Sequence, residues 1–361
     1  MAAWVKGDAA DTDAAVAAAA ALLGAARTPI LAGLCADVAA VRAAYRLADR
    51  IGASLDPVAG PGLYAELGSL SAGGALTTTA PETLGRADTV LVVGSRPWDG
   101  DLVSEIAGSE PVRGLSAGEE RTVLSLGGPR NGTSRHVAYG IGNAGLDVAI
   151  GHLRAFVRGH LAGEEAYGDL ARKLAAAKFG VVIYDAGEIG EAGTEMLQGL
   201  LKDLNEKTRF FALGLADPFQ GRAVLQLAAW TTGQAPRVGF GRHLPEHDPW
   251  RFDSARQVAQ GEADAALWLA ALPAPRPDWL ARLPSIAIVG EDSADARPDT
   301  AEIVIAVGVP GASAGGAVWN DRRGVIGYVP ASGSSAAATA ATAASVIAEI
   351  SKKIAQEGAS C

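Results

Sequence analysis

TVLVVG, residues 89–94, is a run of β-branched and aliphatic residues that ends in glycine. A continuous apolar run of this length is typical of a strand that is buried on both faces of a parallel sheet. Further runs of this kind occur along the chain, each followed by glycine or proline and then by helical sequence, and the pattern predicts an α/β fold with two sheets. They are residues 28–32, 53–56, 122–126, 180–184, 209–213, 265–269, 285–289 and 303–307.

The composition excludes several classes of protein. The chain has 361 residues, of which 49% are hydrophobic, and this is enough for about two domains. A net charge of −9 argues against a nucleic-acid partner, because phosphate binding needs clustered Lys and Arg. The two cysteines, Cys35 and Cys361, cannot supply a four-cysteine cluster or a disulfide scaffold, and this usage suits the cytoplasm.

The N-terminal region predicts a helix and no membrane segment. The apolar run at residues 14–23 is mostly alanine and is too short to span a bilayer. Three aspartates precede it, where a secretion signal would carry positive charge. We expect Asp11 or Asp13 to cap an alanine-rich helix within residues 1–20. A second Ala-rich helix is expected in the C-terminal segment 331–361.

Three short motifs suggest catalysis, but their context favours structural roles. The GIGNAG stretch at 140–145 matches a dinucleotide fingerprint and precedes a predicted helix at 146–157, but its strand is short, so a tight turn is expected. The GASAG stretch around Ser313 resembles a hydrolase elbow, yet no histidine follows it in the chain. The HLPEH stretch at 243–247 contains Pro245, which argues against a zinc-binding helix. Cys35 is expected to be a small buried hydrophobe.

Several stretches of the chain resemble the large, tungsten- or molybdenum-pterin subunit of formylmethanofuran dehydrogenase. The resemblance covers about residues 20–330. It implies two related Rossmann-like α/β domains with mostly parallel sheets, as in the central domains of formate dehydrogenase-type pterin enzymes. The stretches that carry it are KDLNEKTRF (202–210), WTTG (230–233), VGF (238–240), ADTVLVVG (87–94) with Pro97, GEADA (261–265) and DPVAGP (56–61).

The chain departs from that family where the redox groups are bound. The family carries an N-terminal domain with four cluster cysteines, whereas here we expect the first α/β element to begin almost at once. The family also places a metal-ligating cysteine before a glycine–proline turn, and this chain reads Val58-Ala59-Gly60-Pro61 there. We therefore expect the chain to bind no tungsten or molybdenum pterin, no iron–sulfur cluster and no other metal.

A dehydrogenase-like subunit without redox groups resembles the corresponding component, B, of the bacterial formyltransferase/hydrolase complex. The resemblance implies one-carbon metabolism during formaldehyde oxidation, in which formyl-tetrahydromethanopterin yields formate through a methanofuran-like carrier. It also implies three partners: an amidohydrolase-like subunit, a formyltransferase subunit and a β-helical subunit. The leading hypothesis is a non-catalytic structural subunit.

The resemblance also implies a discontinuous domain. Residues 21–58 and 179–330 would form one α/β domain, and residues 59–178 would form an inserted one. The strand at 30–32 should then share a sheet with the strand at 181–184. The sequence without the resemblance suggests a simple division near residue 160, with residues 164–178 as a connecting helix.

Two alternative functions remain open. The first is a binding subunit for a carrier with a polyglutamyl tail, because a polyanion is bound by Arg and Lys. The second is an active pterin oxidoreductase subunit that holds its metal through another residue. The predicted carrier contacts are Arg237, Arg242 and His243, together with Arg96 and Arg130 on loops after strands, and no catalytic residue is predicted. Trp98, Trp250, Trp279 and Trp319 are candidates for interface anchors or for packing beneath loops.

Overall fold

The computed structural model describes residues 2–58, 60–129, 136–163, 166–332 and 341–358. The chain divides into two compact units. Unit 1 comprises residues 1–59, 218–319 and 326–361, and unit 2 comprises residues 60–217 and 320–325. Each unit is an α/β structure with its own sheet.

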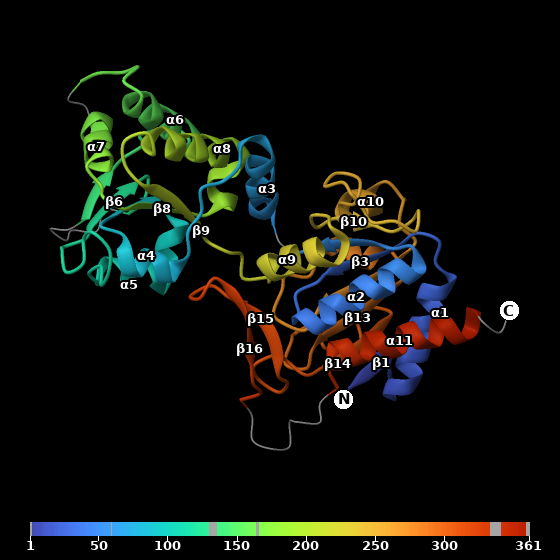
Figure 1. Cartoon of the computed structure of the whole chain (residues 1–361). Coiled ribbons are helices and arrows are strands. Elements are labelled where there is room, and N and C mark those ends of the chain that lie inside the picture. The colour runs from blue at the N-terminus through green and yellow to red at the C-terminus, as the bar shows by residue number, and fades with distance from the viewer. Residues whose placement is uncertain (1, 59, 130–135, 164–165, 333–340, 359–361) are drawn as a thin grey trace. The chain divides into compact units, whose positions relative to one another are not determined.

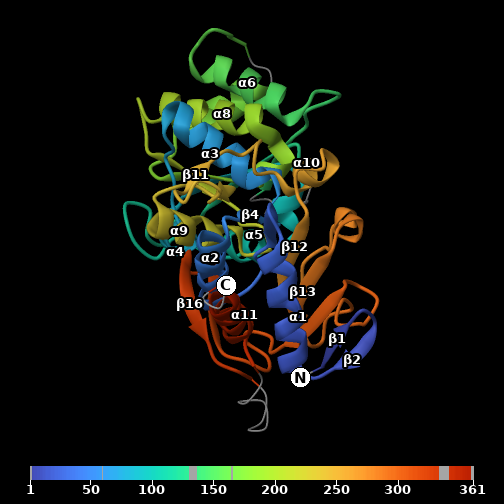
Figure 2. The same cartoon turned by 90° about the vertical axis from the view of Figure 1, so that its right-hand side faces the viewer.

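Unit 1 contains a nine-stranded mixed sheet with the order β11-β10-β4-β3-β12-β13-β14-β1-β2. The five central strands from β4 to β14 are parallel, and the outer pairs are antiparallel. Figure 2 shows β1 and β2 at one edge of this sheet. The strands are β1 (Ala3–Val5), β2 (Asp8–Ala10), β3 (Pro29–Gly33), β4 (Ser54–Pro57), β10 (Val238–Gly239), β11 (Glu246–His247), β12 (Ala265–Ala270), β13 (Ser285–Gly290) and β14 (Ile303–Val307).

Successive residues of the central strands of unit 1 enter two different cores. Leu267 and Leu269 of β12 pack into one cluster with α1, α2, α9 and α11, whereas Ala266 and Trp268 pack into a second cluster beneath the loops. This alternation follows from the two-residue repeat of a strand. Figure 1 shows α1, α2 and α11 along one face of the sheet. The helices are α1 (Thr12–Ala25), α2 (Val38–Ile51), α9 (Gly221–Thr232), α10 (Ser254–Ala259), α11 (Ala343–Gly358) and the 3-10 helix η2 (Asp278–Arg282).

Unit 2 contains a five-stranded parallel sheet with the order β7-β6-β5-β8-β9. Helices α3, α6, α7 and α8 cover one face, and α4 and α5 cover the other (Figure 1). The strands are β5 (Thr89–Val93), β6 (Thr122–Leu126), β7 (His136–Tyr139), β8 (Gly180–Tyr184) and β9 (Phe210–Gly214). The helices are α3 (Pro61–Gly73), α4 (Ala80–Arg86), α5 (Asp101–Ala107), α6 (Leu146–Val157), α7 (Ala166–Ala175), α8 (Ala186–Leu204) and the 3-10 helix η1 (Arg96–Asp99).

Strands β15 (Gly316–Asn320) and β16 (Val325–Val329) form a separate two-stranded sheet. The GASAG stretch leads into β15, so a strand, not a helix, follows Ser313. The Ser313 hydroxyl accepts a hydrogen bond from the Val309 N–H at 3.0 Å and therefore stabilises a local turn.

The prediction that β3 and β8 share a sheet is wrong. Strand β8 pairs in register with β5, where Thr89 lies opposite Gly180, and with β9 on its other side. Unit 2 therefore continues through β8, α8 and β9 to residue 217, whereas the expected insertion ended at residue 178. The physical reason is that without β8 and β9 the sheet would consist of β7, β6 and β5 alone. The buried strand β5 would then have one edge without hydrogen-bond partners.

The N-terminal segment also differs from the expectation. The first helix begins at Thr12, and the strands β1 and β2 precede it. Asp11 is the N-cap, as predicted, and its carboxylate accepts a hydrogen bond from the Ala14 N–H at 2.7 Å. Cys35 is fully buried, as predicted.

Candidate functional site

The sheet of unit 2 has its switch point between β5 and β8. From β5 the chain moves outward through β6 and β7, and it then returns to the other side of β5 for β8 and β9. Ligands of open α/β sheets bind in the crevice at the carboxyl ends of the strands at such a point. Gly94 directly follows β5, and Asp185 directly follows β8. These two positions mark the crevice of unit 2.

The carboxylate of Glu188 occupies this crevice. Its Oε1 accepts hydrogen bonds from the N–H of Ser95 at 2.8 Å and from the Ser95 hydroxyl at 2.7 Å, and its Oε2 accepts one from the Arg96 N–H at 3.0 Å. Gly94 has a positive φ of 86°, which favours glycine, and a Cβ atom there would also lie 2.2 Å from Oε2. Backbone N–H groups of this kind bind anionic ligands in related folds. Here the protein's own carboxylate takes that place.

The helix that follows β8 positions Glu188. Asp185 is the N-cap of α8, and its carboxylate accepts a hydrogen bond from the Glu188 N–H at 3.0 Å. Glu188 therefore lies in the first turn, where the helix dipole stabilises negative charge. Sequence reasoning missed this residue. The available signals were the glycine that directly follows β5 and an acidic residue three positions after Asp185, the N-cap of α8.

Two buried polar atoms lie beside the same crevice. The Oγ of Ser125 and the Nε1 of Trp98 have no hydrogen-bond partner within the described part of the chain. Both approach Gly128, where a Cβ would lie 2.6 Å from Ser125 Oγ and 2.7 Å from Trp98 Nε1. The Trp98 ring also packs on His136, with 4.8 Å between ring centroids. Trp98 is thus packed beneath a loop.

Unit 1 has its own switch point between β3 and β12, and backbone hydrogen bonds close it. The Cys35 N–H donates to the carbonyl of Leu269 at 3.1 Å, and the Leu272 N–H donates to the carbonyl of Cys35 at 3.0 Å. A Cβ on Gly33 would lie 2.7 Å from the Leu269 oxygen. Backbone hydrogen bonds therefore join the loops after the two strands directly at this switch point.

The carboxyl end of the neighbouring strand β4 carries a buried ion pair. Asp56 Oδ1 lies 2.9 Å from Arg237 Nε, and Asp56 Oδ2 accepts a hydrogen bond from the Ser254 N–H at 2.8 Å. Arg237 Nη2 also lies 2.5 Å from Asp253. Burial raises the pKa of Asp56, and the Arg237 guanidinium partly opposes this change. Arg237 therefore stabilises the loop at 248–254 from a position that is only 19% exposed.

The other predicted carrier contacts on unit 1 lie at the surface. Arg242 is 70% exposed and pairs with Glu246 at 3.1 Å, and Arg251 pairs with the same carboxylate at 3.6 Å. Both arginines line a cavity of about 280 Å³. His243 is exposed and has a positive φ of 58°. Residues 243–247 are not helical, as Pro245 indicated, and Glu246 and His247 form the short strand β11.

Arg96 and Arg130 are the predicted contacts in unit 2. The Arg96 guanidinium is 60% exposed at the rim of the crevice, 3.8 Å from Asp185. Arg130 lies outside the described residues. The structure thus brings Arg237, Arg242 and His243 to the β10–β11 edge of unit 1 and places Arg96 in the other unit.

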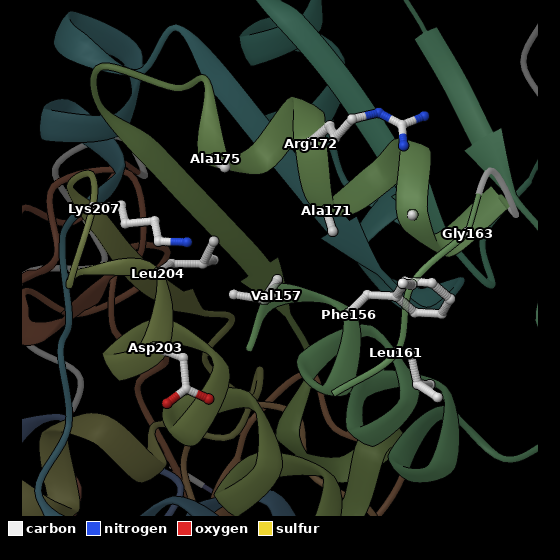
Figure 3. A pocket seen from close by; sticks show the side chains of 12 residues that line it. Phe156, Val157, Leu161, Gly163, Ala171, Arg172, Ala175, Asp203, Leu204 and Lys207 are labelled. Carbon is white, nitrogen blue, oxygen red and sulfur yellow. The ribbon is translucent and has the colours of Figure 1, made fainter. Parts of the chain in front are cut away.

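A small apolar pocket lies near the C-terminal ends of α6 and α8 (Figure 3). Its volume is about 250 Å³, and its lining includes Phe156, Val157 and Leu204. Both helices follow strands of the parallel sheet, so their C-terminal ends lie at the opposite edge from the switch point. In Figure 3 the Lys207 ammonium extends toward Leu204, whereas the Arg172 guanidinium points away from the apolar residues. The pocket is therefore separate from the crevice at the switch point.

The described residues show neither a grouped set of metal ligands nor a membrane-spanning helix. Within these ranges no three His, Cys, Asp or Glu side chains are grouped so that they could hold a metal ion. The helices in the same ranges include none that is long and apolar enough to cross a membrane.

Known proteins place the chain in a family. No family model matches it. It is 67% identical, over the full length of both chains, to a protein of Methylorubrum extorquens described as the B component of the formyltransferase/hydrolase complex Fhc. It also matches a chain in the crystal structure of the formyltransferase/hydrolase complex FhcABCD from Methylorubrum extorquens with methylofuran, with a TM-score of 0.96, 66% identity and 99% coverage of both chains. This chain belongs to the family of the B component of the formyltransferase/hydrolase complex.

Proposed function

We propose that this chain is a non-catalytic structural subunit of a formyltransferase/hydrolase complex. The observation that carries the proposal is that the protein's own groups fill both switch points. In unit 2 the Glu188 carboxylate accepts hydrogen bonds from the backbone N–H groups that follow β5. In unit 1 the loops that contain Cys35 and Leu269 are hydrogen-bonded to each other. An α/β subunit whose ligand crevices are filled by its own groups can still contact other subunits through its outer surface.

The same closure argues against a bound pterin cofactor. Phosphate groups of a cofactor would compete with the Glu188 carboxylate for the Ser95 and Arg96 N–H groups, and the two anions would repel each other. Cys35, the one cysteine among the described residues, is fully buried with its Sγ 3.6 Å from the Pro273 carbonyl. A thiol in this position is inert. The pterin oxidoreductase alternative therefore has no support in either crevice.

The strand orders of both sheets fit the fold that the resemblance to a pterin dehydrogenase implies. Numbered from its first strand, the sheet of unit 2 has the order 3-2-1-4-5, and the parallel centre of unit 1 has the order 2-1-3-4-5. Both are doubly wound orders. We take both units to be Rossmann-like, and we infer that the amidohydrolase-like, formyltransferase and β-helical subunits are the partners of this chain.

Assembly and metal content test the structural role. Co-expression of the partner subunits with and without this chain, followed by size-exclusion chromatography, should show that the complex forms only with it. Elemental analysis of the purified complex should find no stoichiometric tungsten or molybdenum. A complex that assembles without the chain, or one equivalent of either metal bound to this chain, would overturn the proposal.

A carrier-binding role is the second candidate, because the matched crystal structure contains methylofuran. We propose Arg242, His243 and Arg96 as direct contacts for an anionic carrier tail, and Arg130 as a further one. Arg237 is assigned to positioning, since Asp56 and Asp253 already bind its guanidinium.

Substitution separates the contacts from general charge effects. The pair Arg242→Ala and His243→Ala should lower carrier retention by the complex, whereas Arg282→Ala, an exposed arginine elsewhere in unit 1, should not. Carrier content would be measured after denaturing release. Equal carrier content in all three complexes would remove this candidate and leave the structural role untouched.

A further inference from the structure

A long groove of unit 1 lies on the face formed by α2 and α11. These two helices pack against each other, and the start of β15 and Tyr328 of β16 complete the groove. Figure 1 shows α2 and α11 side by side, with β15 and β16 near one end. The volume is about 1030 Å³, compared with about 250 and 280 Å³ for the cavities described above. The groove is therefore large enough for a stretch of polypeptide.

Basic side chains of α2 line this groove in a regular row. Arg42, Arg46 and Arg50 are spaced by four residues, so they lie on one face of the helix. Lys352 of α11 adds a fourth cation. The one acidic residue in the lining is Asp37, which is only 8% exposed and accepts a hydrogen bond from the Ala39 N–H. The groove is thus strongly basic in a protein whose net charge is −9.

Two of these arginines have no ion pair or hydrogen bond to their guanidinium groups among the described residues. Arg50 Nη1 donates a hydrogen bond to the Ser351 carbonyl at 3.1 Å and so joins the two helices. Lys352 lies 3.6 Å from the exposed Glu349. Arg42 and Arg46 are exposed, and in the described ranges no carboxylate or carbonyl oxygen binds either guanidinium. Two like charges one helical turn apart are unfavourable without an anion between them.

The floor and the end of the groove suit a protein partner. Small residues such as Ala39, Ala43, Ala344 and Ala348 form much of the lining and would allow the backbone of a partner to approach closely. Tyr328 lies at the end of the groove with 72% of its surface exposed. Tyrosine and arginine, with tryptophan, are enriched among the residues that dominate binding energy at protein interfaces.

We propose that this groove docks an acidic polypeptide segment of a partner subunit. Successive arginines in the row are about 6 Å apart along the axis of α2. Carboxylates at every second residue of an extended strand, or at every fourth residue of a helix, repeat at nearly the same distance. Such a segment would neutralise Arg42 and Arg46 and place an apolar side chain against Tyr328. The proposal rests on the structural role proposed above.

Charge reversal tests the docking site in the intact complex. The double variant Arg42→Glu and Arg46→Glu should weaken association with the partner subunits at least tenfold, and the loss should be smaller in high salt. The matched control is Arg282→Glu and Arg297→Glu, two exposed arginines of the same unit with the same change in net charge, and it should assemble normally. Circular dichroism of both variants establishes that the chain is folded.

Crosslinking identifies the occupant of the groove. A photoreactive residue in place of Ala43 should crosslink, in the assembled complex, to an acidic segment of one partner subunit. Reversing the acidic residues of that segment to Lys should restore assembly with the double variant. Normal assembly of the double variant overturns the inference. It is also overturned if the residue at position 43 crosslinks to the carrier and the double variant assembles but no longer retains the carrier. If the complex assembles without this chain, the structural role itself fails.

Discussion

Arg237 was predicted to bind a carrier, but in the structure it forms ion pairs within the protein. Its position in a basic stretch of sequence suggested an anionic ligand, but the chain supplies two anions of its own, Asp56 and Asp253. Neither aspartate is near Arg237 in the sequence, so no local sequence pattern predicts the ion pairs. Local sequence gives the charge of a side chain, whereas its partner depends on the fold.

Replacing Arg237 should expose the cost of a buried charge. Arg237→Ala leaves the Asp56 carboxylate buried without a cation, and we expect a loss of about 3–5 kcal/mol in the free energy of unfolding. Urea denaturation measures the change. Arg242→Ala removes an exposed pair and should cost at most about 0.5 kcal/mol. Similar losses for the two variants would contradict the buried pair.

The pH dependence of that variant has a definite sign. Burial already raises the pKa of Asp56 in the folded protein, and loss of Arg237 removes the group that opposes this change. A folded carboxyl with a raised pKa costs stability above that pKa, and the cost vanishes as pH falls toward the unfolded value near 3.8. The deficit of Arg237→Ala should therefore shrink between pH 7 and pH 4.

Glu188 offers a direct test of the closed crevice. Glu188→Ala leaves the N–H groups of Ser95 and Arg96 and the Ser95 hydroxyl without their acceptor, so stability should fall by about 1–3 kcal/mol. Inorganic phosphate or sulfate should then raise the melting temperature of the variant and leave the original protein unchanged. The control is Glu195→Ala, an exposed position on the same helix. An equal response to phosphate in all three proteins would contradict the assignment.

At the scale of elements, the sequence predicts most strands and helices but not which sheet each strand joins. The helix at 146–157 and the strand at 122–126 have the bounds that their patterns predicted. The resemblance implied that β8 shares a sheet with β3, and nothing within a continuously apolar strand indicates which sheet it joins. The short strands β1 and β2 were not predicted, because three residues are too few to show a strand pattern. The signal available in the sequence was Gly7, which lies in the two-residue turn between them and has a positive φ.

The partner of β8 depends on a glycine. A Cβ on Gly180 would lie 2.0 Å from the ring of Phe210 on β9, so Gly180→Ala should force the two strands apart and cost about 1–3 kcal/mol. Gly151→Ala is the matched control, because nothing lies within 4 Å of its Cβ position in α6, and it should stabilise by about 0.5–1 kcal/mol. Chemical denaturation measures both. A destabilised Gly151→Ala beside a neutral Gly180→Ala would contradict the β8–β9 pairing.

At the scale of the whole molecule, the cores of the two units are made of separate residues. The two hydrophobic clusters of unit 1 draw on residues of that unit, and the two clusters of unit 2 draw on residues 65–215. Unit 1 is therefore discontinuous in the sequence, and the segment inserted between its parts has its own core. The sequence could predict a break near residue 59 from the resemblance to a pterin enzyme, but the return at residue 218 depends on the strand pairing of β8 and β9.

Separate cores predict separate responses to substitution. Gly180→Ala should speed amide hydrogen exchange among the strands of unit 2 and leave β3, β12 and β13 protected, whereas Arg237→Ala should do the reverse. The double variant should lose the sum of the two single losses to within about 0.5 kcal/mol, since the two sites belong to units with separate cores. Exchange followed by mass spectrometry resolves the units in one experiment. If either single variant speeds exchange equally in both sheets, the chain unfolds as one cooperative body, and the division of the core into two would have to be abandoned.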